Sequence, residues 1–244
     1  MIRSPLSCRT RTGPGHVPQP DISCHHAHGL THCPIAARPP TPAPSQQTIA
    51  LRSLPVCALL VLWDIDHTLT ENHGVNKEVY ALAFELLAGR PAEHPAQTDG
   101  RTEPEIMRNM LAVHGIEAGP GRLARIPEAL VSATETKADT LRERGHELPG
   151  ARAALAAFQS APGIVQSVLT GNIRPNAVTK LSVFGLDCYI DFDAGGYGSD
   201  DDVRANLVGI AQARGSARYG QVFDKRNTIL VGDTLRDVRA AYIR

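Results

Sequence analysis

The sequence predicts an α/β fold, a doubly wound parallel sheet with an α-helical cap inserted after the first strand. Three observations lead to this prediction. Short apolar runs alternate with helical patterns, about ninety mostly helical positions separate the first strand from the second, and polar clusters follow directly on three of the predicted strands. An insertion of that length exceeds an ordinary crossover and indicates a separate helical unit.

The predicted strands are short and strongly apolar. Residues 57–63 (CALLVLW) form one continuous run, as expected of a strand buried on both faces of a sheet. Further strands are predicted at 164–169, 188–192 and 228–231. Between them, apolar residues recur at helical spacing at Val178, Leu181 and Val183, and at Val203, Leu207 and Ile210. This alternation of strand and helix favours a parallel sheet.

The inserted region contains several predicted helices. The first has Asn76 ahead of its apolar positions and Gly89 after them. The second begins with the pattern TEPE at 102–105, which is typical of a capping box. A third helical stretch, 122–144, is interrupted by Pro127.

Residues 1–55 differ from the rest in composition. Ten of the 18 prolines lie before position 57, and none of the eleven aromatic residues does. Such a segment buries too little apolar surface to offset the entropy of ordering, so a disordered extension is predicted. Its tract CHHAHGLTHC at 24–33 has the residue types of a zinc site, but it lacks the paired cysteine spacing, so the metal reading is the weaker one.

The chain is therefore expected to have three parts. They are the extension of residues 1–55, a Rossmann-like core of residues 56–73 and 151–244, and a helical cap of residues 74–150.

Charge and cysteine content exclude some classes of protein. The chain has 25 basic and 25 acidic residues, and residues 57–244 hold 20 and 24 of them, a net charge of −4. This balance gives no attraction to nucleic acid or anionic membranes. No apolar run approaches the roughly 20 residues of a membrane-spanning helix. Cys57 and Cys188 alone imply no disulfide framework, so a soluble, cytoplasmic protein is predicted.

Asp64 and Asp66 stand directly after the first strand, at the end where open α/β sheets bind ligands. Residues two apart on an extended chain point to the same side. Two neighbouring carboxylates repel each other unless a cation or a proton lies between them, so the pair is costly without a use. The pattern Asp-x-Asp-x-Thr also occurs by chance and is informative only in combination with other clusters.

Thr170, Gly171 and Asn172 follow the second predicted strand. A hydroxyl group beside an unhindered glycine N–H suits an oxyanion such as phosphate. The alternative is an ordinary strand-to-helix turn in which Thr170 or Asn172 caps the helix.

Asp233 and Asp237 follow the strand at 228–231. Asp233 is placed to complete an oxygen site for Mg²⁺ with the first pair of carboxylates, and Asp237 to hold Asp233 or a metal-bound water. The alternative makes Asp233 a helix N-cap and Asp237 a first-turn acid. Each cluster has such an alternative, but three in order at strand ends favour a common site.

Together these clusters resemble the haloacid dehalogenase superfamily, from about Leu59 to the C-terminus, and look like its phosphoglycolate phosphatase-like branch with an inserted helical cap. The quoted motifs are DIDHT at 64–68, TGN at 170–172 and GDTLRD at 232–237. The resemblance implies a Mg²⁺-dependent phosphomonoester hydrolase that acts on a small phosphorylated metabolite.

The resemblance also implies roles for the candidate residues. Asp64 would be the nucleophile that forms an aspartyl phosphate, and Asp66 the general acid and base. Mg²⁺ would be held by Asp64, the backbone carbonyl of Asp66, and Asp233. The phosphoryl oxygens would be bound by Thr170 and the Gly171 amide, with Asn172 as a further substrate-binding candidate.

The family places a basic residue, usually lysine, on the phosphoryl site. Lys180 falls in the helix directly after 170–172, early in the chain for this role. Arg204 opens a helix ahead of the last predicted strand and can pair bidentately with phosphate or carboxylate. Arg204 is therefore favoured as the catalytic and substrate-binding cation, although either residue could also be a solvated surface cation.

Other functions use the same residues. A sugar phosphomutase would use all of them. A dehalogenase is disfavoured, because resemblance to that branch of the family would not imply a second acid like Asp66. The chain also ends a few residues into its last helix, where family members continue through a further strand. Together with the absent lysine, this makes a truncated, non-catalytic binding protein the rival from another class.

Overall fold

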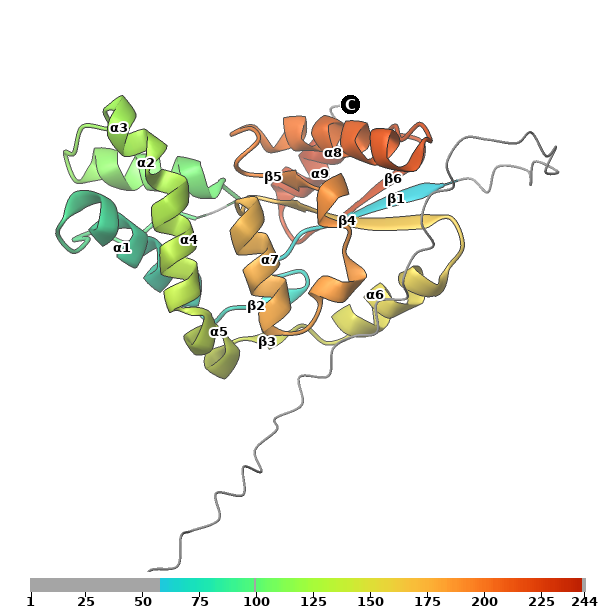
Figure 1. The fold of residues 1–244 in the computed structure, drawn as a ribbon, viewed down its shortest axis with the longest axis horizontal. Coiled ribbons are helices and arrows are strands. Elements are labelled where there is room, and N and C mark those ends of the chain that lie inside the picture. Colours follow the sequence, from blue (N-terminus) through green and yellow to red (C-terminus); the bar gives the residue numbers. More distant parts are fainter. Residues whose placement is uncertain (1–57, 99, 243–244) are drawn as a thin grey trace, which may run out of the picture. The chain divides into compact units, whose positions relative to one another are not determined.

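A computed structural model describes residues 58–98 and 100–242 of the chain. The predicted extension of residues 1–55, its cysteine and histidine tract, and Cys57 lie outside the described residues. The main sheet has four parallel strands in the order β5-β4-β1-β6 (Figure 1). They are β1 (Leu59–Trp63), β4 (Ile164–Thr170), β5 (Gly196–Tyr197) and β6 (Thr228–Val231). The predicted α/β class and parallel sheet are confirmed.

The central strand β1 is covered by helices on both faces. Since successive side chains of a strand point to opposite faces, Leu60 and Leu62 pack into one apolar cluster and Val61 and Trp63 into another. The first cluster includes residues of α8 (Arg204–Tyr219) and α9 (Leu235–Tyr242), and the second includes residues of α6 (Ala151–Ser160) and α7 (Arg174–Val183). This two-sided cover is the doubly wound arrangement.

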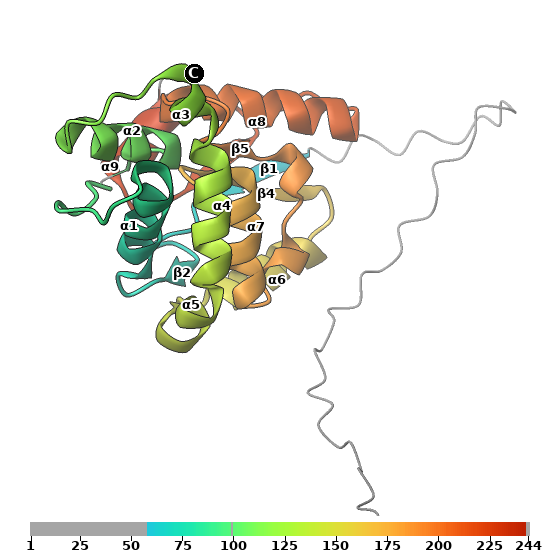
Figure 2. The same ribbon diagram turned by 60° about the vertical axis from the view of Figure 1, so that its left-hand side comes forward.

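Residues 74–150, called the insertion below, follow β1 and are mainly helical. Its helices are α1 (Val75–Ala88), α2 (Glu103–Val113), α3 (Pro120–Ala124), α4 (Ile126–Thr136) and α5 (Ala138–Arg144). They share an apolar cluster of their own around Phe84, Met107 and Leu130, and α1 and α4 run side by side (Figure 2). Helices α4 and α5 also contact α7 of the core.

A short antiparallel ribbon joins the insertion to the core. Strand β2 (Thr70–Glu71), where the chain leaves the core, pairs with β3 (His146–Glu147), where it returns. The two crossings therefore lie next to each other.

One predicted strand is wrong. Residues 188–192 do not form a strand but fall across two 3₁₀ turns, Asp187–Tyr189 and Phe192–Ala194, and the strand beside β4 is Gly196–Tyr197. The carboxylate of Asp191 accepts a hydrogen bond from the N–H of Asp193, which favours a turn. The backbone of Gly196 passes so close to α8 that a Cβ there would lie 2.6 Å from the Leu207 carbonyl oxygen.

Two helix boundaries also differ from the prediction. Asn76 lies inside the first turn of α1 rather than ahead of it, and Gly74 is the N-cap. Pro127 lies in the first turn of α4, where its missing N–H costs nothing, and the breaks fall at Arg125 and Lys137. Among the described helices, none combines the length and apolar character needed to cross a bilayer.

Candidate active site

A cavity of about 620 Å³ lies at the carboxyl ends of β1, β4 and β6. Its wall includes seven of the residues that the sequence named as candidates, namely Asp64, Asp66, Thr170, Gly171, Asn172, Arg204 and Asp233. The insertion contributes Asn76, Lys77, Tyr80 and Arg101, among others. Parallel strands end at the same edge of a sheet, which is why segments far apart in the sequence meet here.

Asp64 is held at the floor of this cavity by backbone bonds. Its N–H donates to the Val231 carbonyl oxygen at 2.8 Å, so the ends of β1 and β6 stay together. Its Oδ1 accepts the Ile65 N–H at 2.8 Å, and its Oδ2 lies 2.8 Å from Nη2 of Arg204. Burial raises the pKa of Asp64 to about 7, against the opposing effect of the Arg204 charge.

Arg204 is the first residue of α8, and its side chain reaches the ends of β1 and β4. Its Nη2 also lies 2.7 Å from Oδ1 of Asp237 and donates to the Leu169 carbonyl oxygen at 3.2 Å. The side chain is buried, and its Nε has no hydrogen-bond partner among the described residues. A buried cation is thus shared by two carboxylates, and the reading of Arg204 as a solvated surface cation is wrong.

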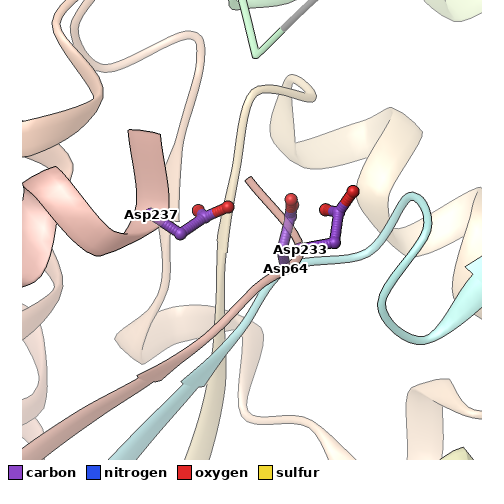
Figure 3. Close-up of side chains that lie close together, drawn as sticks. All are labelled: Asp64, Asp233 and Asp237. Atoms are coloured by element: carbon purple, nitrogen blue, oxygen red, sulfur yellow. The ribbon is translucent and has the colours of Figure 1, made fainter. Parts of the chain in front are cut away.

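Asp233 and Asp237 lie beside Asp64, with carboxylate oxygens of all three within 4.8 Å of one another (Figure 3). Asp237 forms a reciprocal cap with Thr234: its Oδ2 accepts the Thr234 N–H at 3.0 Å, and its own N–H donates to the Thr234 hydroxyl at 3.3 Å. The alternative of Asp233 as the helix cap is therefore wrong. Asp233 is exposed, with the Thr68 hydroxyl 3.5 Å away.

This donor set fits a hard divalent cation. Mg²⁺ prefers oxygen ligands and commonly binds one or two carboxylates. Asp237 accepts from Arg204 and from both the N–H and the hydroxyl of Thr234. Among the described residues, Asp64 accepts only one bond on each oxygen, and Asp233 has only the Thr68 hydroxyl as a donor near it, so these two carboxylates have more acceptor capacity left. Their mutual repulsion would also be relieved by a cation.

Asp66 has a different set of partners. Its carboxylate lies 2.9 Å from Nζ of the buried Lys180 and accepts hydrogen bonds from Asn76 at 2.9 Å and Asn172 at 3.0 Å. Burial alone would raise the pKa of Asp66, but Lys180 and these amides together lower it. The carboxyl group of Asp66 is therefore ionised in this conformation.

The loop after β4 is hydrogen-bonded to the same residues that surround Asp66. The Thr170 hydroxyl accepts a hydrogen bond from Nδ2 of Asn172 at 2.7 Å, and Oδ1 of Asn172 accepts one from Lys180 at 2.6 Å. Neither Thr170 nor Asn172 caps α7, whose N-cap is Ile173. The capping alternative for these two residues is therefore wrong.

Several contributors to the site were not selected from the sequence. Lys180 was set aside because of its position in the chain, yet it pairs with Asp66. Asn76 carries no motif, and its contact with Asp66 depends on how α1 lies against the core. Asp237, in contrast, was named from the sequence as a residue that would hold Asp233 or a metal-bound water, and the structure shows it bonded to Arg204 and Thr234.

Comparison with known proteins agrees with this architecture. Residues 59–241 match the family model described as haloacid dehalogenase-like hydrolase. Similar solved structures include CbbY from Rhodobacter sphaeroides in complex with phosphate, with 17% identity, a TM-score of 0.57, and 75% of this chain and 81% of that chain covered. A hydrolase from Pseudomonas syringae has 18% identity, a TM-score of 0.52, and coverages of 75% and 80%.

A predicted phosphoglycolate phosphatase from Haemophilus somnus 129pt has 14% identity, a TM-score of 0.50, and coverages of 77% and 82%. No curated protein shows significant similarity to the chain. At these identities the solved structures establish the shared fold, whereas the family match, which spans most of the chain, establishes membership. The chain belongs to the haloacid dehalogenase-like hydrolase family.

Proposed function

We propose that this hydrolase is a Mg²⁺-dependent phosphatase that cleaves phosphomonoesters of small metabolites through an aspartyl phosphate on Asp64. The observation that carries the proposal is the pairing of buried Asp64 with Arg204 at 2.8 Å, beside Asp233, on the wall of a 620 Å³ cavity. A cavity of that size suits a small molecule. A cytoplasmic location stays a prediction.

In the first step, an oxygen of Asp64 attacks phosphorus and the bond to the leaving oxygen breaks, while a proton reaches that oxygen from Asp66. Arg204 orients the Asp64 carboxylate and places a positive charge beside the incoming anion. Mg²⁺, held by Asp64, Asp233 and the Asp66 carbonyl, would neutralise charge on the phosphoryl group.

In the second step, water attacks phosphorus and its proton passes to Asp66, which frees Asp64 and inorganic phosphate. The contacts seen here suit this step, because Lys180 and two amides keep Asp66 ionised and able to accept a proton. For the first step, Asp66 must instead be protonated and turn from Lys180 toward the leaving oxygen.

The proposal is tested by phosphate release from a chromogenic aryl phosphate by the full chain, with Mg²⁺ and with EDTA. Metal-dependent release supports it, and release that EDTA leaves unchanged contradicts the metal requirement. Product analysis with sugar phosphates separates hydrolysis from a phosphomutase, which would return transferred rather than free phosphate. A folded protein without turnover on any phosphate ester would favour the non-catalytic binding protein.

A further inference from the structure

The N-terminus of α7 is held by a residue from a distant part of the chain. Its N-cap residue, Ile173, has no side-chain oxygen, and the helix has no side-chain cap of its own. Oε2 of Glu103 accepts the N–H of Ile173 at 2.9 Å and the side-chain Nδ2 of Asn176 at 2.9 Å. Glu103 is the first residue of α2, in the insertion, and lies 70 positions earlier.

The backbone of Glu103 holds the same loop from its other side. Its N–H donates to the Gly171 carbonyl oxygen at 2.8 Å. One residue of the insertion thus binds Gly171 and Ile173, the two neighbours of Asn172. Since Asn172 bonds both Thr170 and Asp66, its position depends on these two anchors.

Packing leaves the loop no room to shift toward the insertion. A Cβ on Gly171 would lie 2.5 Å from the carbonyl oxygen of Arg101. Glu103 is 1% exposed, so its hydrogen bonds do not compete with bulk water. The contact between Glu103 and the loop is therefore buried and tightly packed rather than exposed at the surface.

The charged and titratable groups around Glu103 come from three elements. Tyr80 of α1 lies beside it, and Lys180 of α7 and Asp66 after β1 act on its charge. Burial raises the pKa of Glu103 to about 7, against the opposing effect of Lys180. Both the neutral and the ionised carboxyl group can accept the bonds from Ile173 and Asn176.

We propose that Glu103 is a positioning residue for the candidate phosphate loop, so that residues 170–172 reach their working conformation only when the insertion is seated on the core. The identity of the loop's ligand, phosphate, rests on the proposed function. The dependence of the loop on Glu103 does not. Glu103 touches no reacting group in this account and acts through Gly171, Ile173 and Asn172.

The test compares Glu103→Ala, Glu103→Gln and Arg108→Ala in the full chain. Arg108 provides the matched control, because it also ties α2 to the core, 2.5 Å from Asp202, without touching the loop. Amide hydrogen exchange of residues 171–173 is measured together with binding of inorganic phosphate in the presence of Mg²⁺, and with kcat and KM on an aryl phosphate.

Glu103→Ala should speed exchange at Ile173 and weaken phosphate binding by about tenfold each, the effect of losing one or two buried hydrogen bonds. Glu103→Gln keeps an acceptor oxygen and should restore both, and Arg108→Ala should change neither. Exchange unchanged in Glu103→Ala, or accelerated equally in Arg108→Ala, would overturn the proposal. If Glu103→Ala does not fold, Glu103→Asp keeps the carboxylate but shortens the side chain away from the Ile173 N–H, and it decides by the same exchange readout.

The two proposals fail separately. If the wild-type protein releases no phosphate from any ester, the proposed function fails, while exchange at Ile173 still reports whether Glu103 positions the loop.

Discussion

Each of the two candidate catalytic carboxylates has its own cation, Arg204 for Asp64 and Lys180 for Asp66. Burial raises the pKa of Asp64, whereas Lys180 and neighbouring amides lower that of Asp66. Two carboxylates with opposite pKa shifts are suited to different roles at one pH. These shifts run opposite to the proposed roles, because a nucleophile must be ionised and a general acid protonated. The assignment therefore rests on the resemblance of the motifs, and a cation bound beside Asp64 would lower its pKa.

Lys180→Met should raise the pKa of Asp66, because it removes the main charge that stabilises the ionised form. The acidic limb of the kcat–pH profile should therefore move to higher pH, and kcat should fall most at the acidic end of the profile. Lys225→Met, at an exposed position outside the cavity, provides the control. An acidic limb that stays in place in Lys180→Met would contradict this role of Lys180.

The raised pKa of Glu103 predicts that the stability of the protein depends on pH. Its pKa in the folded protein is raised to about 7 from the ordinary value of 4.5, so between these pH values the unfolded chain releases a proton that the folded protein keeps. Stability from this group is therefore full below pH 4.5 and is lost as the pH rises through 7. The loss is about 3 kcal/mol at most.

Glu103→Gln should lack this component. Urea unfolding at several pH values should show that the variant gains stability relative to the wild type as the pH rises from 4.5 to 7. A constant difference across that range would contradict the shifted pKa.

At the scale of elements, the insertion contacts the core where the start of α2 lies against the ends of β4 and β5. A Cβ on Gly198 would lie 2.1 Å from the Gly171 carbonyl oxygen and 2.8 Å from Cβ of Thr102. Thr102 also donates to Asp202 at 3.4 Å. Three segments from different parts of the chain thus pass within contact distance, and glycine is needed where they cross.

Gly198→Ala should destabilise the protein by about 1–3 kcal/mol, because the clash is with backbone that cannot rotate away. Gly121→Ala is the matched control, since it lies in α3 with open space around its Cβ position and should be neutral or slightly stabilising. Chemical unfolding measures both. Equal effects of the two substitutions would refute the close approach at Gly198.

The elements also show what the sequence could predict. The strands β1, β4 and β6 and the clusters after them were predictable, because buried parallel strands are continuous apolar runs and their ends share one edge. Strand β5 was not, because it has two residues and depends on the approach of Gly196 to α8. Lys180 contacts Asp66, 114 positions away, and Glu103 contacts Ile173, 70 positions away. A local sequence pattern cannot predict contacts over such separations.

At the scale of the whole molecule, binding of a divalent cation should stabilise the folded protein against unfolding. The candidate ligands Asp64 and Asp233 come from segments 169 positions apart and meet only in the folded protein. Mg²⁺ should therefore raise the thermal unfolding midpoint, by the equivalent of about 2.7 kcal/mol at a hundredfold excess over its Kd. Because burial raises the pKa of Asp64 to about 7, the effect should be larger at pH 8 than at pH 6.

Asp233→Asn should abolish the stabilisation by Mg²⁺, and Asp139→Asn, at a highly exposed position of α5, should leave it intact. A shift that persists in Asp233→Asn would place the metal elsewhere.

The proposed function requires Asp64 as the nucleophile, and phosphate release with Mg²⁺ by the wild type, Asp64→Asn and Asp139→Asn tests this requirement. The asparagine side chain keeps the size of Asp64 but has no carboxylate to attack phosphorus. We expect Asp64→Asn to lose turnover by about 10³-fold or more while Asp139→Asn remains at the wild-type rate. A folded Asp64→Asn variant that still releases phosphate at the wild-type rate would contradict the account.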